Sequence, residues 1–249
     1  KMIFDQFWYE GEVSILFADT NLGKSILAVQ IGNSISKGMP IKGFKSETTK
    51  QKVLYFDFEL TDKQFQNRYS INFENSYSFD DDFLRVQINP ETTSNSSLSE
   101  EELIIKSLEE TIIKTNAKII IIDNLTYLKN ETEKARNASP LMKLLRALKN
   151  KYDLSILILA HTPKRDQSKP LSKNDLQGSK MIINFCDSCF AIGESQKDSK
   201  LRYLKQIKVR QSEFKFDTNN VALCQIDKPL NFLGFEFLDF SSEREHLKE

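Results

Sequence analysis

The sequence has few cysteines, no long apolar run and no excess of charge of either sign. Its 3 cysteines are too few, and odd in number, for a disulfide framework, which favours a reduced, cytoplasmic setting. No apolar stretch reaches the ~18 residues that a membrane-spanning helix needs, so we expect no membrane contact. The 35 Lys and Arg residues balance 35 Asp and Glu residues. This balance excludes a globally basic nucleic-acid-binding protein, although a local basic patch remains open.

The composition that is present is that of a globular protein. Hydrophobic residues make up 39% and charged residues 28% of the 249 residues. A chain of this length buries roughly 70–75% of its unfolded surface and needs no disulfide or metal to fold. We expect one α/β domain over residues 1–249.

Short apolar runs alternate with segments of helical periodicity. Strands are predicted at residues 13–17, 53–58, 84–88, 119–122, 155–160, 181–192 and 203–209, and helices at 25–36, 99–115 and 141–151. The run at 119–122 is four consecutive isoleucines, which is typical of a strand buried on both faces. Residues 232–240 alternate apolar and polar, which indicates an antiparallel edge or hairpin. The pattern predicts a mostly parallel twisted sheet with helices on both faces and a C-terminal antiparallel hairpin.

Two of the cysteines form a C-x-x-C pair, Cys186 and Cys189, inside the apolar run 181–192. No second pair and no ligand-rich loop accompanies them. Free cysteine packs as a small hydrophobic residue, so we expect both to be buried strand residues.

The strongest motif is Ala18-Asp-Thr-Asn-Leu-Gly-Lys-Ser25, which reads A-x-x-x-x-G-K-S. This is the spacing of a phosphate-binding loop, here with Ala in the first glycine position, and it lies between a predicted strand and a predicted helix. In such a loop the backbone N–H groups point at a phosphate, the lysine reaches the β- and γ-phosphates, and the serine hydroxyl ligates Mg²⁺. An ordinary strand–turn–helix is the alternative. The predicted ATP-binding residues are Ala18, Asp19, Thr20, Asn21, Leu22, Gly23, Lys24, Ser25 and Ile26.

Carboxylates follow two of the predicted strands. Asp123 ends the isoleucine run and is predicted to hold Mg²⁺ together with Ser25. Asp57 and Glu59 stand at the end of the strand at 53–58. Residues two apart on a strand point to one face, so both could face the nucleotide. Glu59 lies further out and is our candidate for the base that orients the attacking water.

Three further sets of polar residues follow later strands. His161 ends the strand at 155–160 and could report the γ-phosphate to the next loop, or be a satisfied core histidine. That loop carries Lys164, Arg165, Lys169 and Lys173, which are either nucleic-acid backbone contacts or a solvated charged loop. Lys208 and Arg210 are two residues apart at the end of the strand predicted at 203–209, so we expect both to point the same way. They are either surface charges or cations that act in a neighbouring subunit.

Taken in order, these motifs resemble the RecA-type ATPases. The phosphate-binding loop, Glu59 after the next strand and the apolar run into Asp123 are similar to that family, and within it to the hexameric replicative helicases of the DnaB and plasmid RepA kind and to KaiC-like ATPases. His161 resembles the polar sensor of the RepA type, and Lys208-Val-Arg210 resembles the Lys-x-Arg pair that enters a neighbouring active site.

The resemblance implies a RecA-like fold, ATP and Mg²⁺ as ligands and a homo-oligomeric ring, expected to be a hexamer. It implies Glu59, Lys24, His161, Lys208 and Arg210 as catalytic residues. Two functions remain open: a single-stranded DNA motor, such as the replicative helicase of a plasmid or mobile element, and a KaiC-like assembly switch. A third reading, an inert phosphate-binding loop, is disfavoured because Lys24, Ser25, Glu59 and Asp123 are all present.

Overall fold

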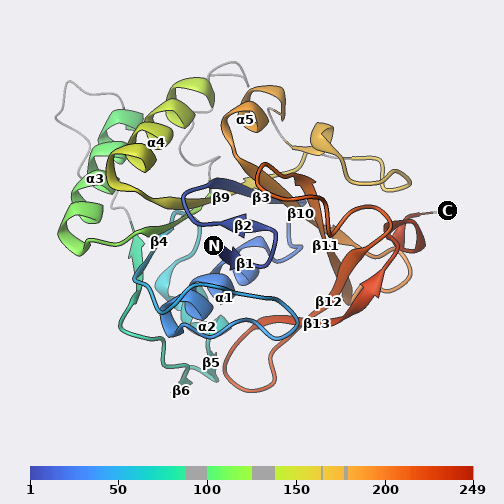
Figure 1. The fold of residues 1–249 in the computed structure, drawn as a ribbon. Coiled ribbons are helices and arrows are strands. Elements are labelled where there is room, and N and C mark those ends of the chain that lie inside the picture. The colour runs from blue at the N-terminus through green and yellow to red at the C-terminus, as the bar shows by residue number, and fades with distance from the viewer. Residues whose placement is uncertain (88–99, 125–137, 164, 177–178, 249) are drawn as a thin grey trace.

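A nine-stranded sheet forms the centre of the protein in a computed structural model that describes residues 1–87, 100–124, 138–163, 165–176 and 179–248 (Figure 1). The strand order is β13-β12-β11-β10-β3-β9-β8-β4-β7. The out-of-sequence order places the chain's first long strand, β3, between two strands that come much later. Residues distant in the sequence are thereby brought to one edge.

Six neighbouring strands are parallel: β3 (Val13–Ala18), β4 (Val53–Asp57), β7 (Phe83–Gln87), β8 (Ile119–Asp123), β9 (Ser155–His161) and β10 (Ser188–Glu194). Their carboxyl ends lie along one edge, where open α/β sheets bind ligands. The register sets Ala18 beside His161, and Asp57 beside Asp123. Ala18, Asp57, Asp123 and His161 therefore converge at this edge.

The remaining three strands of the sheet are antiparallel: β11 (Leu201–Lys208), β12 (Val221–Asp227) and β13 (Gly234–Ser241). Because β11 runs against β10, its last residue, Lys208, pairs with Cys189 near the amino-terminal end of β10. The predicted architecture, a mostly parallel sheet with a C-terminal antiparallel hairpin, is confirmed.

Helices cover both faces of the sheet (Figure 1). On one face lie α1 (Lys24–Lys37) and α2 (Asp62–Arg68), and on the other α3 (Glu100–Thr115), α4 (Ala138–Tyr152) and α5 (Ser179–Phe185). In α3 the buried side chains Ile104, Leu108 and Ile112 repeat every four residues, which makes one apolar stripe. Two separate apolar cores result, one on each side of the sheet.

Short elements complete the fold. They are the strands β1 (Met2–Phe4), β2 (Trp8–Tyr9), β5 (Ser70–Ile71) and β6 (Asn75–Ser76) and the 3₁₀ helices η4 (Lys173–Asp175) and η5 (Glu243–His246). None of the described helices is both long and apolar enough to cross a membrane.

The prediction of one strand over residues 181–192 is wrong in its first half. Ser179–Phe185 is the helix α5, and only Ser188–Glu194 is a strand. A short apolar run does not distinguish a buried helix from a buried strand, because both hide their side chains. Cys186 and Cys189 are buried free thiols, as predicted, although Cys186 lies between the two elements rather than in the strand.

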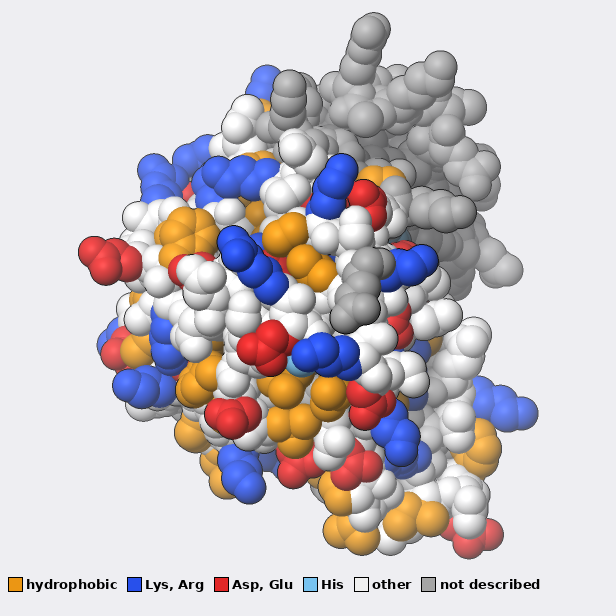
Figure 2. Space-filling view, turned by 90° about the vertical axis from the view of Figure 1, so that its right-hand side faces the viewer, with side chains coloured by type: hydrophobic (Ala, Val, Ile, Leu, Met, Phe, Trp, Pro, Cys, Tyr) orange, Lys and Arg blue, Asp and Glu red, His pale blue; other side chains and the backbone are white. Residues whose placement is uncertain are grey.

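The face toward the right of Figure 1 mixes charges of both signs. Figure 2 shows Lys and Arg side chains interspersed with Asp and Glu among its described residues. Such a surface agrees with the zero net charge of the chain.

Candidate functional site

The phosphate-binding loop connects the buried strand β3 to α1. Its backbone turns through Asn21 and Gly23, which have positive φ values of 64° and 97°. Helix α1 then begins at Lys24 with no acidic residue in its first turn, so the partial positive charge of the helix end is not offset by its own side chains. Ser25 and Ile26 are half-buried in that first turn, while Thr20 and Asn21 are exposed. The loop therefore offers N–H groups and a positive helix end to an anion.

Gly23 is required for a second reason that the motif alone does not reveal. A Cβ atom at this position would lie 2.7 Å from Cδ1 of Ile226 and 3.0 Å from the ring of Phe235. These residues belong to β12 and β13, so the C-terminal hairpin packs directly on the loop. Gln30 of α1 also exchanges two hydrogen bonds with the backbone of Phe235, of 2.7 and 2.9 Å. The hairpin therefore buttresses the loop.

The ammonium of Lys24 is held inside the loop. Its Nζ donates to the backbone oxygens of Ala18 and Asp19, each at 3.1 Å. Burial lowers the pKa of Lys24, while the nearby carboxylates of Glu59 and Asp123 oppose that shift. The site therefore already contains one buried cation that faces two acidic groups.

Asp123 is fully buried at the end of β8. Its Oδ2 accepts a 2.5 Å hydrogen bond from the Tyr55 hydroxyl, whereas its Oδ1 is buried without a hydrogen-bond partner. Burial raises the pKa of Asp123 to about 6. The nearby hydroxyls of Ser25 and Tyr55 act in the opposite direction and offset this rise only in part. An unpaired carboxylate oxygen near a serine hydroxyl suits a hydrated Mg²⁺, which takes oxygen ligands and uses few protein groups. The residues present therefore fit the predicted metal.

Glu59 and His161 meet at the same edge. Glu59 lies between β4 and α2, and its Oε1 is 3.2 Å from Nε2 of His161. Asn124 donates from Nδ2 to the same Glu59 oxygen and lies 3.0 Å from His161 Nε2. The contact with His161 lowers the pKa of Glu59, although burial opposes it. Asn124 was not a predicted site residue, and its position next to Asp123 is the only signal of it in the sequence.

Asp57 points elsewhere than expected. Its Oδ2 accepts a 2.8 Å bond from Nε of Arg85, and its Oδ1 accepts from the backbone N–H groups of Glu59 and Leu60. The expectation that Asp57 and Glu59 share one face is wrong, because β4 ends at Asp57 and the two-residue alternation ends with it. Asp57 holds the chain in place, and Glu59 reaches the site.

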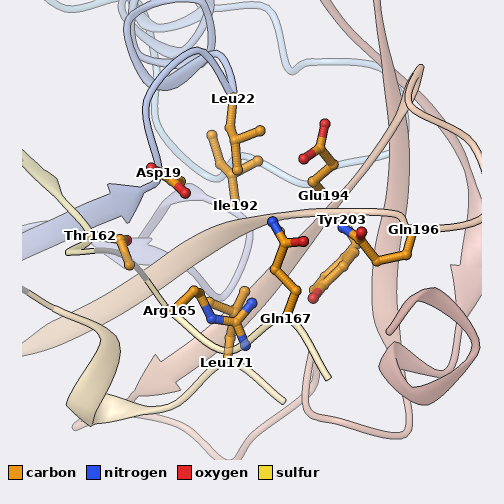
Figure 3. A pocket seen from close by; sticks show the side chains of 11 residues that line it. Asp19, Leu22, Thr162, Arg165, Gln167, Leu171, Ile192, Glu194, Gln196 and Tyr203 are labelled. Atoms are coloured by element: carbon orange, nitrogen blue, oxygen red, sulfur yellow. The ribbon is translucent and has the colours of Figure 1, made fainter. Parts of the chain in front are cut away.

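A small cavity adjoins the loop on the β10 side (Figure 3). Asp19 and Leu22 line it from the loop, and Thr162, Arg165 and Leu171 from the segment after β9. Its 20 Å³ has room for about one water molecule, and not for a nucleotide base.

The predicted basic loop is only partly exposed. Arg165, whose side chain is 11% exposed, bonds to Asp175 at 3.2 Å and to the backbone oxygen of Lys169, so its guanidinium is bound within the segment rather than fully solvated. Lys169 is exposed and lies 3.4 Å from Asp166, and Lys173 is exposed at the start of η4. Lys164 lies outside the described residues.

Lys208 and Arg210 lie at the opposite edge of the sheet. Lys208 donates to the backbone oxygens of Ile183 and Cys186, at 2.7 and 2.6 Å, and so closes the end of α5. Arg210 pairs with Asp187 while its side chain stays 61% exposed. Asp187 in turn accepts a hydrogen bond from the N–H of Val13. Val13 stands five residues before Ala18 on β3, so about 16 Å of strand separates it from the start of the phosphate-binding loop. Neither cation is near this chain's own phosphate-binding loop.

The chain is similar in fold to one solved structure and matches one protein family. The crystal structure of the RadB recombinase superposes with a TM-score of 0.58 at 15% sequence identity, over 93% of each chain, which confirms the predicted RecA-like fold. No curated protein sequence matches the chain. A protein family described as the AAA domain matches residues 1–167, which is more than half of the 249 residues. The chain with this phosphate-binding loop therefore belongs to the AAA domain family.

Proposed function

We propose that the protein is an ATP-hydrolysing RecA-like motor that acts on single-stranded DNA, as a replicative helicase-type ATPase of a plasmid or mobile element does. We further propose that it works as a homo-oligomeric ring, a hexamer. The observation that carries the proposal is the convergence of Lys24, Ser25, Asp123, Glu59 and His161 at one edge of the sheet. Phosphoryl transfer to water needs groups that bind the phosphates, ligands for Mg²⁺ and a base that orients the attacking water. One subunit supplies a candidate for each at this edge.

The residues divide the chemistry between them. The loop N–H groups and Lys24 bind the β- and γ-phosphates, and the contacts of Lys24 with Ala18 and Asp19 are exchanged for phosphate oxygens. Ser25 and Asp123 would hold Mg²⁺, which neutralises charge that develops on the phosphates. Glu59 accepts a proton from the water that attacks the γ-phosphorus. His161 is the last residue of β9 and contacts Glu59, and the basic loop comes directly after it. His161 therefore links the γ-phosphate site to that loop.

The DNA partner is supported by exposed cations beside this link. Lys169 and Lys173 are exposed in the segment that follows His161, where a phosphate backbone could reach them. The alternative, a KaiC-like assembly switch without translocation, is favoured by a different observation. Arg165 is bonded within the segment and Lys169 lies near Asp166. Fewer of the segment's basic side chains are therefore available to bind DNA than the number of basic residues in its sequence suggests.

The ATPase rate with and without single-stranded DNA separates these functions. A motor should be stimulated several-fold, because DNA contact with the basic segment repositions His161 and Glu59. Joint exchange of Lys169 and Lys173 to Ala should remove the stimulation, whereas exchange of the exposed Lys106 and Lys114 on α3 should not. A rate that single-stranded DNA leaves unchanged would favour the switch.

We predict that Glu59→Gln retains ATP binding and loses hydrolysis by about 10²–10⁴-fold, because the amide keeps the shape but cannot accept the proton. Asp57→Asn keeps an oxygen for the two backbone N–H groups, but its amide nitrogen cannot accept from Arg85, so turnover should fall by less than in Glu59→Gln without staying at the wild-type rate. Single-turnover hydrolysis and binding of an ATP analogue measure the two effects. The roles are reversed if Asp57→Asn stops turnover while Glu59→Gln leaves it intact.

A further inference from the structure

Arg85 makes an unusually large set of contacts for a residue of the outermost parallel strand. It lies in the middle of β7 with a side chain that is 15% exposed. Its guanidinium donates to Oδ2 of Asp57 at 2.8 Å, to the backbone oxygen of Leu60 at 2.7 Å and to Oδ1 of Asp62 at 2.6 Å. All three acceptors lie in one short stretch of chain.

That stretch is the connection that carries Glu59. It begins at Asp57, the last residue of β4, and ends at Asp62, the first residue of α2. Arg85 therefore binds the connection before Glu59 and again after it. Gln87, two residues further along β7, donates to the same Leu60 oxygen at 2.9 Å. Both ends of the connection are tied to a rigid strand, and the Glu59 side chain projects between them.

The contacts within the connection depend on the same ion pair. Asp57 is buried, and its second oxygen accepts the N–H groups of Glu59 at 3.1 Å and Leu60 at 2.9 Å. The rotation of this carboxylate decides where those N–H groups lie, and Arg85 holds the rotation through Oδ2. The backbone of Glu59 is therefore fixed through Asp57 as well as around it.

Only a guanidinium fills this place. Its donors lie in one plane in fixed directions, whereas the ammonium of lysine is a single point of charge. The Arg85 guanidinium also lies over the Phe65 ring, 4.4 Å from its centroid, which fixes its plane. The bond to Asp62 adds little by itself, because that side chain is 82% exposed. The contacts with buried Asp57 and with the Leu60 carbonyl are the ones that matter.

We infer that Arg85 is a positioning residue for Glu59: it holds the 57–62 connection so that the Glu59 carboxylate meets the attacking water. The inference rests on the proposed ATP hydrolysis. Displacement of a reacting group by ~1 Å can cost about 100-fold in rate even when binding is intact. Loss of the clamp should therefore lower kcat and leave nucleotide affinity unchanged, since the phosphate-binding loop has no contact with Arg85 among the described hydrogen bonds.

The first test is Arg85→Lys, which keeps the charge beside Asp57 but cannot reach all three acceptors. We expect kcat to fall about 10- to 100-fold, with KM for ATP and the affinity for an ATP analogue within about twofold of wild type. Lys50→Ala is the matched control. Lys50 bridges Asp80 and Asp82 at the amino-terminal end of β7, at 2.9 and 3.4 Å, away from Glu59, and its loss should leave kcat unchanged. An Arg85→Lys protein with the kcat of wild type would overturn the inference.

The second test combines Arg85→Lys with Glu59→Gln in single-turnover hydrolysis, with thermal unfolding of each variant as the check on folding. If Arg85 acts through Glu59, it should have no further effect once the carboxylate is gone, and the residual rate of the double variant should equal that of Glu59→Gln. A loss of the same factor in both backgrounds would mean a general structural role and overturn the inference. The wild-type protein tests the proposed function independently. If it hydrolyses no ATP, the proposed function is overturned, and the inference that rests on it is overturned as well.

Discussion

Lys24→Ala is expected to abolish ATP binding or turnover, with ATP affinity lowered by at least an order of magnitude. Lys24 is the cation of the phosphate-binding loop, and its ammonium is buried, where a charge acts at low effective dielectric. Removal of one partner of a buried, hydrogen-bonded charge pair costs about 2–5 kcal/mol, which is roughly 30- to 5,000-fold in affinity. Titration with a fluorescent ATP analogue in the presence of Mg²⁺ measures this loss directly, and hydrolysis should disappear with it.

The control is Lys37→Ala at the other end of α1. Lys37 donates a hydrogen bond to the Tyr77 hydroxyl at 2.6 Å, so its loss perturbs the same helix without touching the loop. ATP affinity should stay at the wild-type value in this variant. The assignment of residues 18–25 as the nucleotide site would be lost if Lys24→Ala bound the analogue as tightly as wild type.

Arg210→Ala is expected to fold, bind ATP and lose hydrolysis. An arginine supplied by a neighbouring subunit stabilises charge on the transferring phosphoryl group and is worth ~10³–10⁵ in rate. Arg210 suits this role because its side chain is 61% exposed at the sheet edge opposite its own loop. Lys208 suits it less, since its ammonium is bound to two carbonyl oxygens at the end of α5.

Mixing Arg210→Ala with Lys24→Ala tests the action in trans. Each variant is inactive alone, but a mixed ring sets an intact phosphate-binding loop against an intact Arg210, so part of the activity should return. Subunits of such a ring pack head to tail through a heterologous interface, and specific activity of the wild type should therefore rise with protein concentration and then level off. Mixed oligomers that form without any return of activity would exclude Arg210 as the trans-acting cation.

The features that follow from local sequence pattern could be predicted without a structure. The loop at 18–25 has a required spacing between one strand and one helix, and both elements lie where predicted. The isoleucines at 119–122 are all buried, because a parallel strand covered by helices on both faces leaves no side exposed to water. Strand periodicity, buried runs and motif spacing are properties of neighbouring residues, and they sufficed to predict the fold class.

The partner of each polar side chain could not be predicted in this way, because it depends on how the strands are arranged in space. Asp57 and Glu59 are two residues apart, yet one is bound by Arg85 and the other lies beside His161, because the strand ends between them. The sequence equally contained no sign of the contacts of Tyr55 with Asp123, of Arg165 with Asp175 in η4, or of the hairpin with Gly23. Each of these contacts joins residues from different elements, and the direction in which a side chain finds its partner depends on the strand order and on the packing around it.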